Sequence, residues 1–335
     1  MPRYWMISDR TVDRTAGQFG SDRNPTLTYW ITDTGPLDNY WSWQEVTADQ
    51  FQSLLIAAVA TFPPIIDPAH QEEQKHIALF VHGYNNTWQQ EAQRYQGLCD
   101  NLFSGDASMG LCIWFDWPSK GTALGYLPDR EGARQCAPDL ADVLDDFYEW
   151  LLDMEKTAAE NPTDPASVCR AKTSVIAHSM GNFLLQQAMY LLWKRKNMPL
   201  LVSLVNQLIM VAADVDNDLF KSGDTVHDTP GDGISNLTYR VTALYSGLDA
   251  VLGASAGLKH FGKRRLGRSG LDTTCPLPDN VWDVNCTPLL PNGPHYSDVW
   301  NVHSIYFSDP KIVSLMREIL RGLDRGILTD RGLIG

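Results

Sequence analysis

The chain alternates strand-like apolar runs with helix-like segments, and this alternation limits its fold more than any other feature. Four runs are apolar at nearly every position, and they cover residues 76–84, 110–118, 172–179 and 205–216. Helix signals follow these runs along the chain. Strands that are apolar on both faces are typical of parallel sheets that helices cover on both sides. The sequence therefore predicts an α/β fold with a mostly parallel, doubly wound sheet.

Further elements are expected on either side of this alternating region. Residues 1–46 combine strand-like runs with many turn formers, and we expect an N-terminal extension there. Residues 253–300 begin with a stretch that has no clear period, which favours a cap or lid excursion. No interdomain linker stands out, so we favour one domain over residues 1–335. The other predictions are strands at 3–8, 27–32, 239–246 and 280–286, and helices at 48–60, 88–103, 137–156, 181–196 and from Asp309 onward.

Composition limits what the protein binds and where it works. The chain is 44% hydrophobic with a formal net charge of −13, which indicates a globular protein with an acidic surface. Such a surface repels phosphate groups, so we expect no nucleic-acid partner. We expect no membrane insertion and a cytoplasmic protein, since no long apolar run and no secretory signal are seen. The cysteines form no C-x-x-C pair, so we expect free thiols, with a Cys275–Cys286 bridge only in an oxidising compartment.

Residues 175–183, VIAHSMGNF, place a serine where a strand meets a helix. Such a turn exposes the hydroxyl of Ser179 at the carboxyl end of the sheet. It requires small residues two positions before and after the serine, and Ala177 and Gly181 stand there. The N–H groups at the helix start also suit a developing oxyanion. An ordinary capping serine would give the same local pattern, but the strand before it and the helix after it favour a nucleophile.

A second strand ends in residues 80–88, FVHGYNNTW. Gly83 lets the backbone fold back toward the nucleophile. The N–H of Tyr84 would then supply one oxyanion donor and the N–H of Met180 the other. We interpret the two neighbouring histidines as structural: His82 and His178.

Four segments in this order resemble the α/β-hydrolase superfamily: FVHGYNNTW, WFDWPSKG, VIAHSMGN and VAADVD. The closest resemblance is to its bacterial esterase/lipase-like branch of largely uncharacterised function, and it covers about residues 75–320. It implies the chain order nucleophile, acid, base. Ser179 is then the nucleophile, Asp249 in YSGLDAVLG the acid, and His303 in WNVHSIYFSDP the base. The alternatives that stay open are Asp214, Asp216 and Asp283 for the acid and His295 for the base.

The resemblance implies a serine hydrolase that cleaves a small-molecule carboxylic ester through an acyl-enzyme, with no cofactor. A thioesterase, a lactonase or an acyltransferase would use the same residues. A non-catalytic binding module on the same fold is the alternative from another class. Tyr84, Trp117 and Tyr126 are candidates for lining the acyl pocket, although simple packing also explains these aromatic residues.

Two charged segments have competing interpretations. Asp214, Asp216 and Asp218 are spaced like the start of a calcium loop, but Leu219 stands where that loop needs a glycine, so we expect no metal. Residues 259–268 contain five basic residues and no acidic one. A solvated or internally paired loop is the favoured interpretation, and a basic lid that meets an anionic substrate or partner is the alternative.

Overall fold

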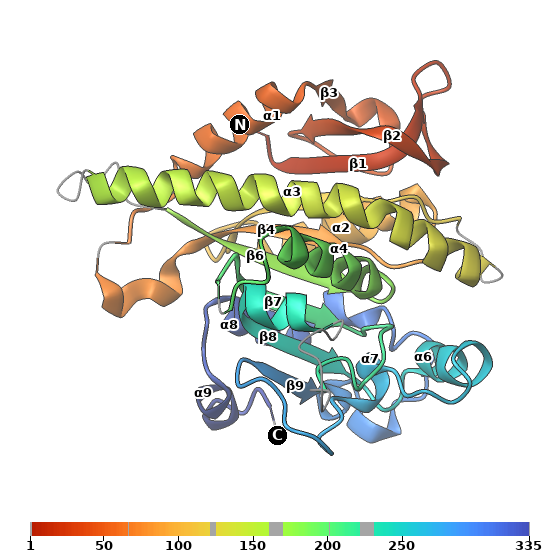
Figure 1. Cartoon of the computed structure of the whole chain (residues 1–335). Coiled ribbons are helices and arrows are strands. Elements are labelled where there is room, and N and C mark those ends of the chain that lie inside the picture. The colour runs from red at the N-terminus through yellow and green to blue at the C-terminus, as the bar shows by residue number, and fades with distance from the viewer. Residues whose placement is uncertain are drawn as a thin grey trace. The chain divides into compact units, whose positions relative to one another are not determined.

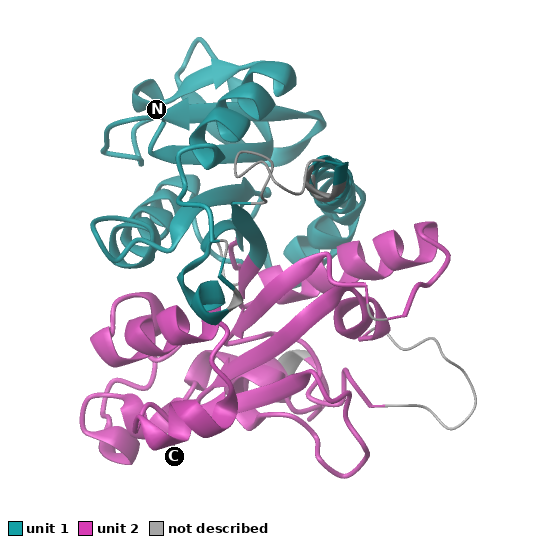
Figure 2. Cartoon of the chain, turned by 90° about the vertical axis from the view of Figure 1, so that its left-hand side faces the viewer, with its two compact units in different colours: residues 1–80, 84–174 teal, residues 81–83, 175–335 magenta. Residues whose placement is uncertain are grey.

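The structure is a computed structural model that describes residues 2–65, 67–120, 125–160, 170–200, 202–221 and 231–334. The described strands form a nine-stranded sheet in the order β3-β2-β1-β5-β4-β6-β7-β8-β9 (Figure 1). The pairs β1–β5, β7–β8 and β8–β9 are parallel, and the pairs β1–β2 and β2–β3 are antiparallel. Helices lie on both sides of the strands (Figure 2). The predicted α/β class with a mostly parallel sheet is confirmed.

The elements follow one another along the chain without an internal repeat. The strands are β1 (Tyr4–Asp13), β2 (Gln18–Thr32), β3 (Gln44–Val46), β4 (Lys75–Val81), β5 (Gly110–Asp116), β6 (Ala171–His178), β7 (Val205–Val211), β8 (Thr238–Tyr245) and β9 (Val281–Asn285). The helices are α1 (Ala48–Val59), α2 (Trp88–Leu102), α3 (Tyr126–Glu160), α4 (Gly181–Arg195), α5 (Asp232–Leu237), α6 (Ala250–Ala254), α7 (Leu266–Ser269), α8 (Pro310–Leu320) and α9 (Arg325–Asp330).

The chain divides into two compact units (Figure 2). Unit 1 comprises residues 1–80 and 84–174, and unit 2 comprises residues 81–83 and 175–335. The strands β4 and β6 each contribute residues to both units. A single domain over the whole chain stays a prediction.

In unit 1 the N-terminal segment is part of the sheet. The strands β1 and β2 form an antiparallel hairpin, and β1 also pairs in parallel with β5, where Trp5 lies opposite Ile113. Because β1 has neighbours on both sides, its first residues are buried. Trp5 packs edge-on against Phe51 of α1, with ring centroids 5.2 Å apart. The segment expected as an extension therefore contributes three strands, β1 to β3.

Helix α1 begins as its sequence predicts. The Thr47 side chain accepts the N–H of Gln50, and the Gln50 side chain accepts the N–H of Thr47. These two bonds satisfy N–H groups that the first helical turn leaves unpaired. Together they form a capping box.

Helix α3 begins earlier than its sequence predicts. It starts at Tyr126 and not near residue 137, and it carries Pro138 in its interior. The buried face of the early part consists of small side chains such as Ala133 and Cys136. Small residues give only a weak apolar period, so the helix was recognisable only from the larger residues that follow.

In unit 2 the strands β7, β8 and β9 continue the sheet in parallel. The segment 253–300, expected as a cap or lid, contains α7, the end of α6 and the strand β9. The strand β7 ends at Val211, earlier than predicted, because Ala212 turns the chain with a φ of 44°. Helix α8 begins at Pro310 after the cap Asp309, as predicted, but the shorter α9 follows it.

Two expectations from composition are also checked by the structure. Five cysteines are free thiols in the described residues, so Cys275 and Cys286 do not form a bridge there. Cys169 lies outside the described residues. Within the described ranges, each helix is too short or too polar to cross a membrane.

Candidate active site

Ser179 lies in unit 2 at the turn between β6 and α4. Its φ is 52°, and a left-handed backbone costs a non-glycine residue about 1–3 kcal/mol. Its N–H donates to the carbonyl of Val211 at 3.0 Å, and its carbonyl accepts the N–H groups of Asn182 and Asp214, both at 3.1 Å. The sharp, strained turn that the sequence predicts is therefore present.

Two glycines let the end of β4 approach this turn. A Cβ on Gly83 would lie 2.9 Å from the Cβ of Ser179 and 3.0 Å from Nδ1 of His178. A Cβ on Gly181 would lie 2.5 Å from the carbonyl oxygen of Val81. Both distances are too short for a side chain, so both positions require glycine. This is the physical reason for the small residue two positions after the serine.

The structure brings Ser179, His303 and Asp249 together within unit 2. Nε2 of His303 lies 2.9 Å from Oγ of Ser179, and Nδ1 of His303 lies 2.7 Å from Oδ2 of Asp249. Asp249 and Ser179 are buried, whereas His303 keeps 8% of its surface exposed. The prediction that the turn exposes the serine side chain is therefore wrong for this structure, because Ser179 has only 1% of its surface exposed. With the proton on Nδ1 facing the carboxylate, Nε2 is free to accept the serine proton. The three residues that the sequence proposes as a triad thus form one hydrogen-bonded chain.

The same carboxylate also starts a helix. Oδ1 of Asp249 accepts the N–H of Leu252 at 2.9 Å and caps α6, while Oδ2 faces the imidazole of His303. Each oxygen of the Asp249 carboxylate therefore has its own hydrogen-bond partner.

The alternative acids have other partners. Asp214 binds the guanidinium of Arg265 at 2.8 Å, and Asp216 binds the same side chain. Oδ2 of Asp283 accepts the N–H of Leu271 at 2.8 Å. Among the described contacts of the four candidate acids, the bond to His303 is made by Asp249.

His178 and His82 contact backbone carbonyls, and a structural role for them stays a prediction. Nε2 of His178 donates to the backbone carbonyl of His303 at 2.9 Å, and the two rings lie 4.9 Å apart. Nδ1 of His82 lies 2.8 Å from the carbonyl of Gly83. His295, the alternative base, is exposed in the short helix Gly293–His295.

The sequence matches one protein-family model over residues 64–274, and that family is described as "Alpha/beta hydrolase of unknown function (DUF900)". The chain belongs to this α/β-hydrolase family. The matched range contains Gly83, Ser179 and Asp249, whereas His303 lies beyond it. Among curated proteins, none matches the sequence.

Solved structures with a similar fold include enzymes from several sources. Carboxyl esterase 2 from the fungus Tuber melanosporum is 12% identical, with a TM-score of 0.38 over 75% of this chain and 79% of the esterase. A predicted CIB-like hydrolase from Thermoplasma acidophilum is 13% identical, with a TM-score of 0.34 over 90% of this chain and 96% of that one. A hormone-sensitive lipase from a metagenome library is 14% identical, with a TM-score of 0.33 over 83% of this chain and 93% of the lipase. The family assignment rests on the sequence match alone.

In unit 1 of this α/β-hydrolase, the loop that follows Gly83 is held by Ser119, which lies just after β5, and by Asp129 of α3. The N–H of Asn85 donates to Oγ of Ser119 at 3.0 Å, and that hydroxyl donates to Asp129 at 3.0 Å. Burial raises the pKa of Asp129, although the Lys120 N–H, the Ser119 hydroxyl and the Asn85 N–H oppose the rise. Sequence reasoning missed Ser119 and Asp129. A serine directly after the strand 110–118 was the available signal.

The aromatic residues proposed for the acyl pocket are mostly buried. Trp117 has no exposed surface, and Tyr126 has 1%. The rings of Tyr84 and Tyr126 meet edge-on with centroids 5.1 Å apart, and Tyr84 is the more exposed of the two. The burial of Trp117 favours the packing interpretation. A role for any of the three in substrate binding stays a prediction.

The basic segment is tied to acidic residues of its own unit. Arg265 is fully buried and pairs with Asp214 and Asp216, and Lys263 lies 3.0 Å from Asp216. Arg268 donates to the backbone carbonyl of Asp249. The side chain of Lys259 lies outside the described residues. These pairs favour an internally paired loop over a basic lid.

Proposed function

We propose that this α/β-hydrolase is a serine hydrolase that cleaves carboxylic esters through an acyl-enzyme intermediate. The observation that carries the proposal is the hydrogen-bonded chain from Oγ of Ser179 through the imidazole of His303 to the carboxylate of Asp249. A serine hydroxyl is a weak nucleophile unless an adjacent base removes its proton as it attacks. Such an attack needs a base in a fixed orientation, and a buried carboxylate can orient that base.

In the proposed reaction, Oγ of Ser179 attacks the ester carbonyl while Nε2 of His303 takes the hydroxyl proton. Asp249 holds the imidazole tautomer and stabilises the imidazolium. The tetrahedral intermediate collapses, the C–O bond to the leaving group breaks, and His303 returns the proton to the departing alcohol. Water then attacks the acyl-serine by the same route and releases the acid.

The negative oxygen of the intermediate needs donors that are already in place. The N–H of Met180 is suited to this task because it lies at the start of α4, where N–H groups have no acceptor within the helix. The N–H of Tyr84 is the proposed second donor. The loss of one such donor typically slows the reaction about 10²–10³-fold.

A fluorophosphonate probe tests the proposal directly because it forms a covalent bond with an activated serine. We expect labelling of the wild-type protein, loss of labelling in Ser179→Ala and strong slowing in His303→Ala. Ser246→Ala is the matched control, since Ser246 also follows a strand of unit 2 directly and is buried. It should label like the wild type.

Hydrolysis assays extend this test to the substrate. A p-nitrophenyl ester series with acyl chains of two to sixteen carbons should be hydrolysed by the wild type and by Ser246→Ala, but not by Ser179→Ala. A thioester with the same acyl group separates an esterase from a thioesterase. If the folded wild type neither reacts with the probe nor hydrolyses any ester, the protein is a non-catalytic binding module and the proposal is wrong.

A further inference from the structure

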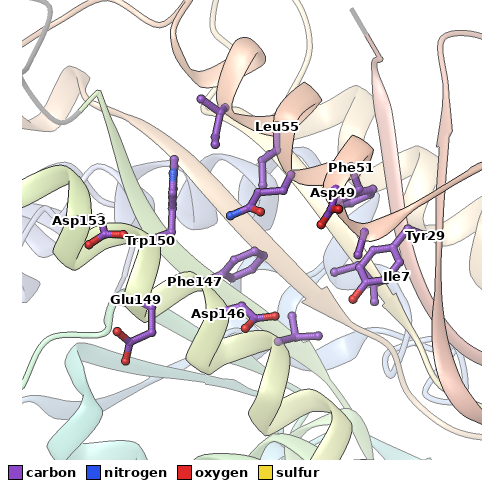
Figure 3. Close-up of a pocket in the computed structure, with 14 residues that line it drawn as sticks. Ile7, Tyr29, Asp49, Phe51, Leu55, Asp146, Phe147, Glu149, Trp150 and Asp153 are labelled. Atoms are coloured by element: carbon purple, nitrogen blue, oxygen red, sulfur yellow. The ribbon is translucent and has the colours of Figure 1, made fainter.

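Unit 1 contains a pocket that the proposed hydrolase chemistry does not use. It has a volume of about 370 Å³ and is lined by residues of β1, β2, α1 and α3 (Figure 3). This volume lies within the range of roughly 300–1,000 Å³ that is typical of small-molecule sites. All fourteen lining residues belong to unit 1.

The floor and the walls of the pocket are apolar and aromatic. Ile7 and Tyr29 are directly paired on β1 and β2, so their side chains share one face of the sheet. Tyr29 packs against Phe51 of α1, with ring centroids 5.3 Å apart. Phe147 and Trp150 extend from α3 toward α1 (Figure 3). The pocket thus offers several aromatic surfaces to a bound molecule.

The charged residues of the pocket are all of one sign. Four of the fourteen lining residues are acidic and none is basic, whereas the whole chain has 27 basic residues against 40 acidic ones. In the part of the chain that the structure describes, Asp49, Asp146 and Asp153 have no side-chain hydrogen bond or ion pair. The acidic bias of the pocket therefore exceeds that of the chain, and three of its carboxylates, those of Asp49, Asp146 and Asp153, form no ion pair with the described residues.

The carboxylates of α3 also crowd one another. Burial raises the pKa of Asp146, and the neighbouring Asp142 and Asp145 raise it further. Tyr29 is close enough to Asp146 for the carboxylate to raise the pKa of its phenol, although burial is the larger cause. A bound positive charge would relieve this repulsion.

We propose that this pocket binds a small amphipathic organic cation, in which an amine or quaternary ammonium group is attached to an aliphatic or aromatic body. The apolar floor stabilises the body through burial. Aromatic faces attract cations, and the carboxylates at Asp49, Asp146 and Asp153 add charge complementarity. An anion of the same shape is repelled by the same groups.

A simple inorganic cation fits the pocket less well. A metal ion needs several oxygen or nitrogen ligands that converge on one point. In the described residues, the group with that spacing is His70, Glu72 and Glu73, which is exposed and is not part of the pocket. A hydrated ion would also bury no apolar surface against the floor of the pocket, so the floor would not stabilise its binding.

Calorimetry on the full chain tests the proposal with three probes of one chain length: decyltrimethylammonium, decyl sulfate and decanol. The two ionic probes are kept below their critical micelle concentrations and decanol below its solubility limit. We expect binding of the ammonium ion, weaker binding of decanol and no binding of the sulfate. The affinity for the cation should fall with added salt, because exposed ion pairs are screened.

Matched variants locate the binding site. Asp146→Asn should weaken cation binding about fivefold, which is the effect of removing one partly exposed charge pair. Asp142→Asn removes the same charge one turn earlier on α3, from an exposed residue that does not line the pocket, and it should weaken cation binding clearly less than Asp146→Asn does. Phe147→Ala should weaken cation and decanol alike. Ser179→Ala should bind as the wild type does, so the result does not depend on the proposed hydrolase activity.

Three outcomes would overturn the proposal. The first is equal binding of the cation and the sulfate, which indicates plain hydrophobic adsorption. The second is cation binding that Asp146→Asn and Asp142→Asn reduce alike. The third is absence of cation binding, including the case in which a lysine-rich peptide binds instead and the pocket is a protein-docking surface.

Discussion

At the scale of single residues, Asp249 combines two tasks that are usually separate. It caps α6 through Oδ1 and holds the imidazole of His303 through Oδ2. One carboxylate therefore links the folding of a short helix to the orientation of the proposed base. Substitutions at this position can separate the two tasks, because an amide keeps the capping oxygen and loses the second acceptor.

Asp249→Asn should lower kcat for ester hydrolysis by about 10⁴-fold, because the amide nitrogen cannot accept the Nδ1 proton and favours the wrong imidazole tautomer. Its melting temperature should stay close to that of the wild type. Asp249→Ala should lose the activity and also the cap, at about 1 kcal/mol of unfolding free energy. Steady-state kinetics and thermal unfolding on both variants check the prediction. A wild-type kcat in Asp249→Asn would exclude Asp249 as the acid.

Gly83→Ala should reduce hydrolysis by about 10²-fold, since a small displacement of the reacting groups has an effect of this size. Its new methyl group would meet Ser179 Cβ at 2.9 Å. Gly97→Ala is the control, because nothing lies within 4 Å of a Cβ there and Gly97 lies inside α2. It should retain full activity and gain up to about 1 kcal/mol of stability. Equal activity of the two variants would contradict the close approach at Gly83.

Sequence reasoning reached the candidate triad because chain order and local pattern are both written in the sequence. Ser179 has a strand before it and a helix after it, and His303 stands shortly before the cap of α8. For the support of the loop after Gly83, the sequence offers one signal, the position of Ser119 directly after a strand, and not the contact itself. Ser119 and Asp129 contact Asn85 only after β4, β5 and α3 have come together, and no local pattern encodes that contact.

At the scale of elements, the basic segment 259–268 shows how burial determines the contribution of an ion pair to stability. Arg265 and Lys263 both bind Asp216, but the Arg265 side chain is 0% exposed and the Lys263 side chain 58%. Arg265 also binds Asp214, which is equally buried. Removal of a buried partner leaves an uncompensated charge, whereas an exposed charge is solvated by water.

Arg265→Met should therefore destabilise the protein by about 3–5 kcal/mol, and Lys263→Met by less than about 1 kcal/mol. Urea unfolding followed by circular dichroism measures both. The double variant Arg265→Met, Asp214→Asn should recover part of the loss, because it also removes the buried charge. Equal costs for the two single variants would show that the Arg265 pair contributes no more than a surface contact.

The predicted boundaries are right where large apolar residues mark an element. They are wrong where the element contains small residues, an interior proline or a left-handed backbone. The runs of β4, β5 and β6 were visible as continuous apolar segments. The start of α3 was not, because Ala133 and Cys136 give a weak period and Pro138 looks like a helix start. The end of β7 was missed because Ala212 adopts a left-handed backbone that its residue type disfavours.

At the scale of the whole molecule, the pairing of strands distant in sequence was the part that could not be predicted. The sequence predicts strands at 3–8 and 27–32, but it does not predict that β1 lies beside β5. Such pairing depends on complementary buried faces and not on local pattern. One consequence is that the N-terminal strands bring a buried carboxyl, Asp9, into the core of unit 1.

Burial raises the pKa of Asp9 to about 7, and the thiol of Cys136 and the Arg23 side chain oppose this rise only in part. In the unfolded chain the pKa is near 3.9. The folded protein therefore binds this proton more tightly, so the carboxyl contributes stability below about pH 4 that is lost as the pH rises through about 7.

Asp9→Asn carries no charge at any pH and should not show this loss. The difference in unfolding free energy between Asp9→Asn and the wild type should grow in favour of the variant between about pH 4 and pH 7, by about a few kcal/mol, and level off above pH 7. Urea midpoints across this range check it. The exposed Asp33→Asn is the control and should follow the wild type. Parallel profiles for Asp9→Asn and the wild type would refute the prediction.

The edge of the sheet at β2 and β3 in unit 1 contains features that disfavour pairing with strands of other molecules. The short β3 covers only residues 29–31 of β2, and the uncovered part of β2 contains Asp22, Arg23 and Pro25. Charges and a proline, which lacks an N–H, make a poor template for a foreign strand. The irregular register between β1 and β2 adds local twist. We therefore expect the exposed part of β2 to be a poor starting point for amyloid-like association, even at high protein concentration.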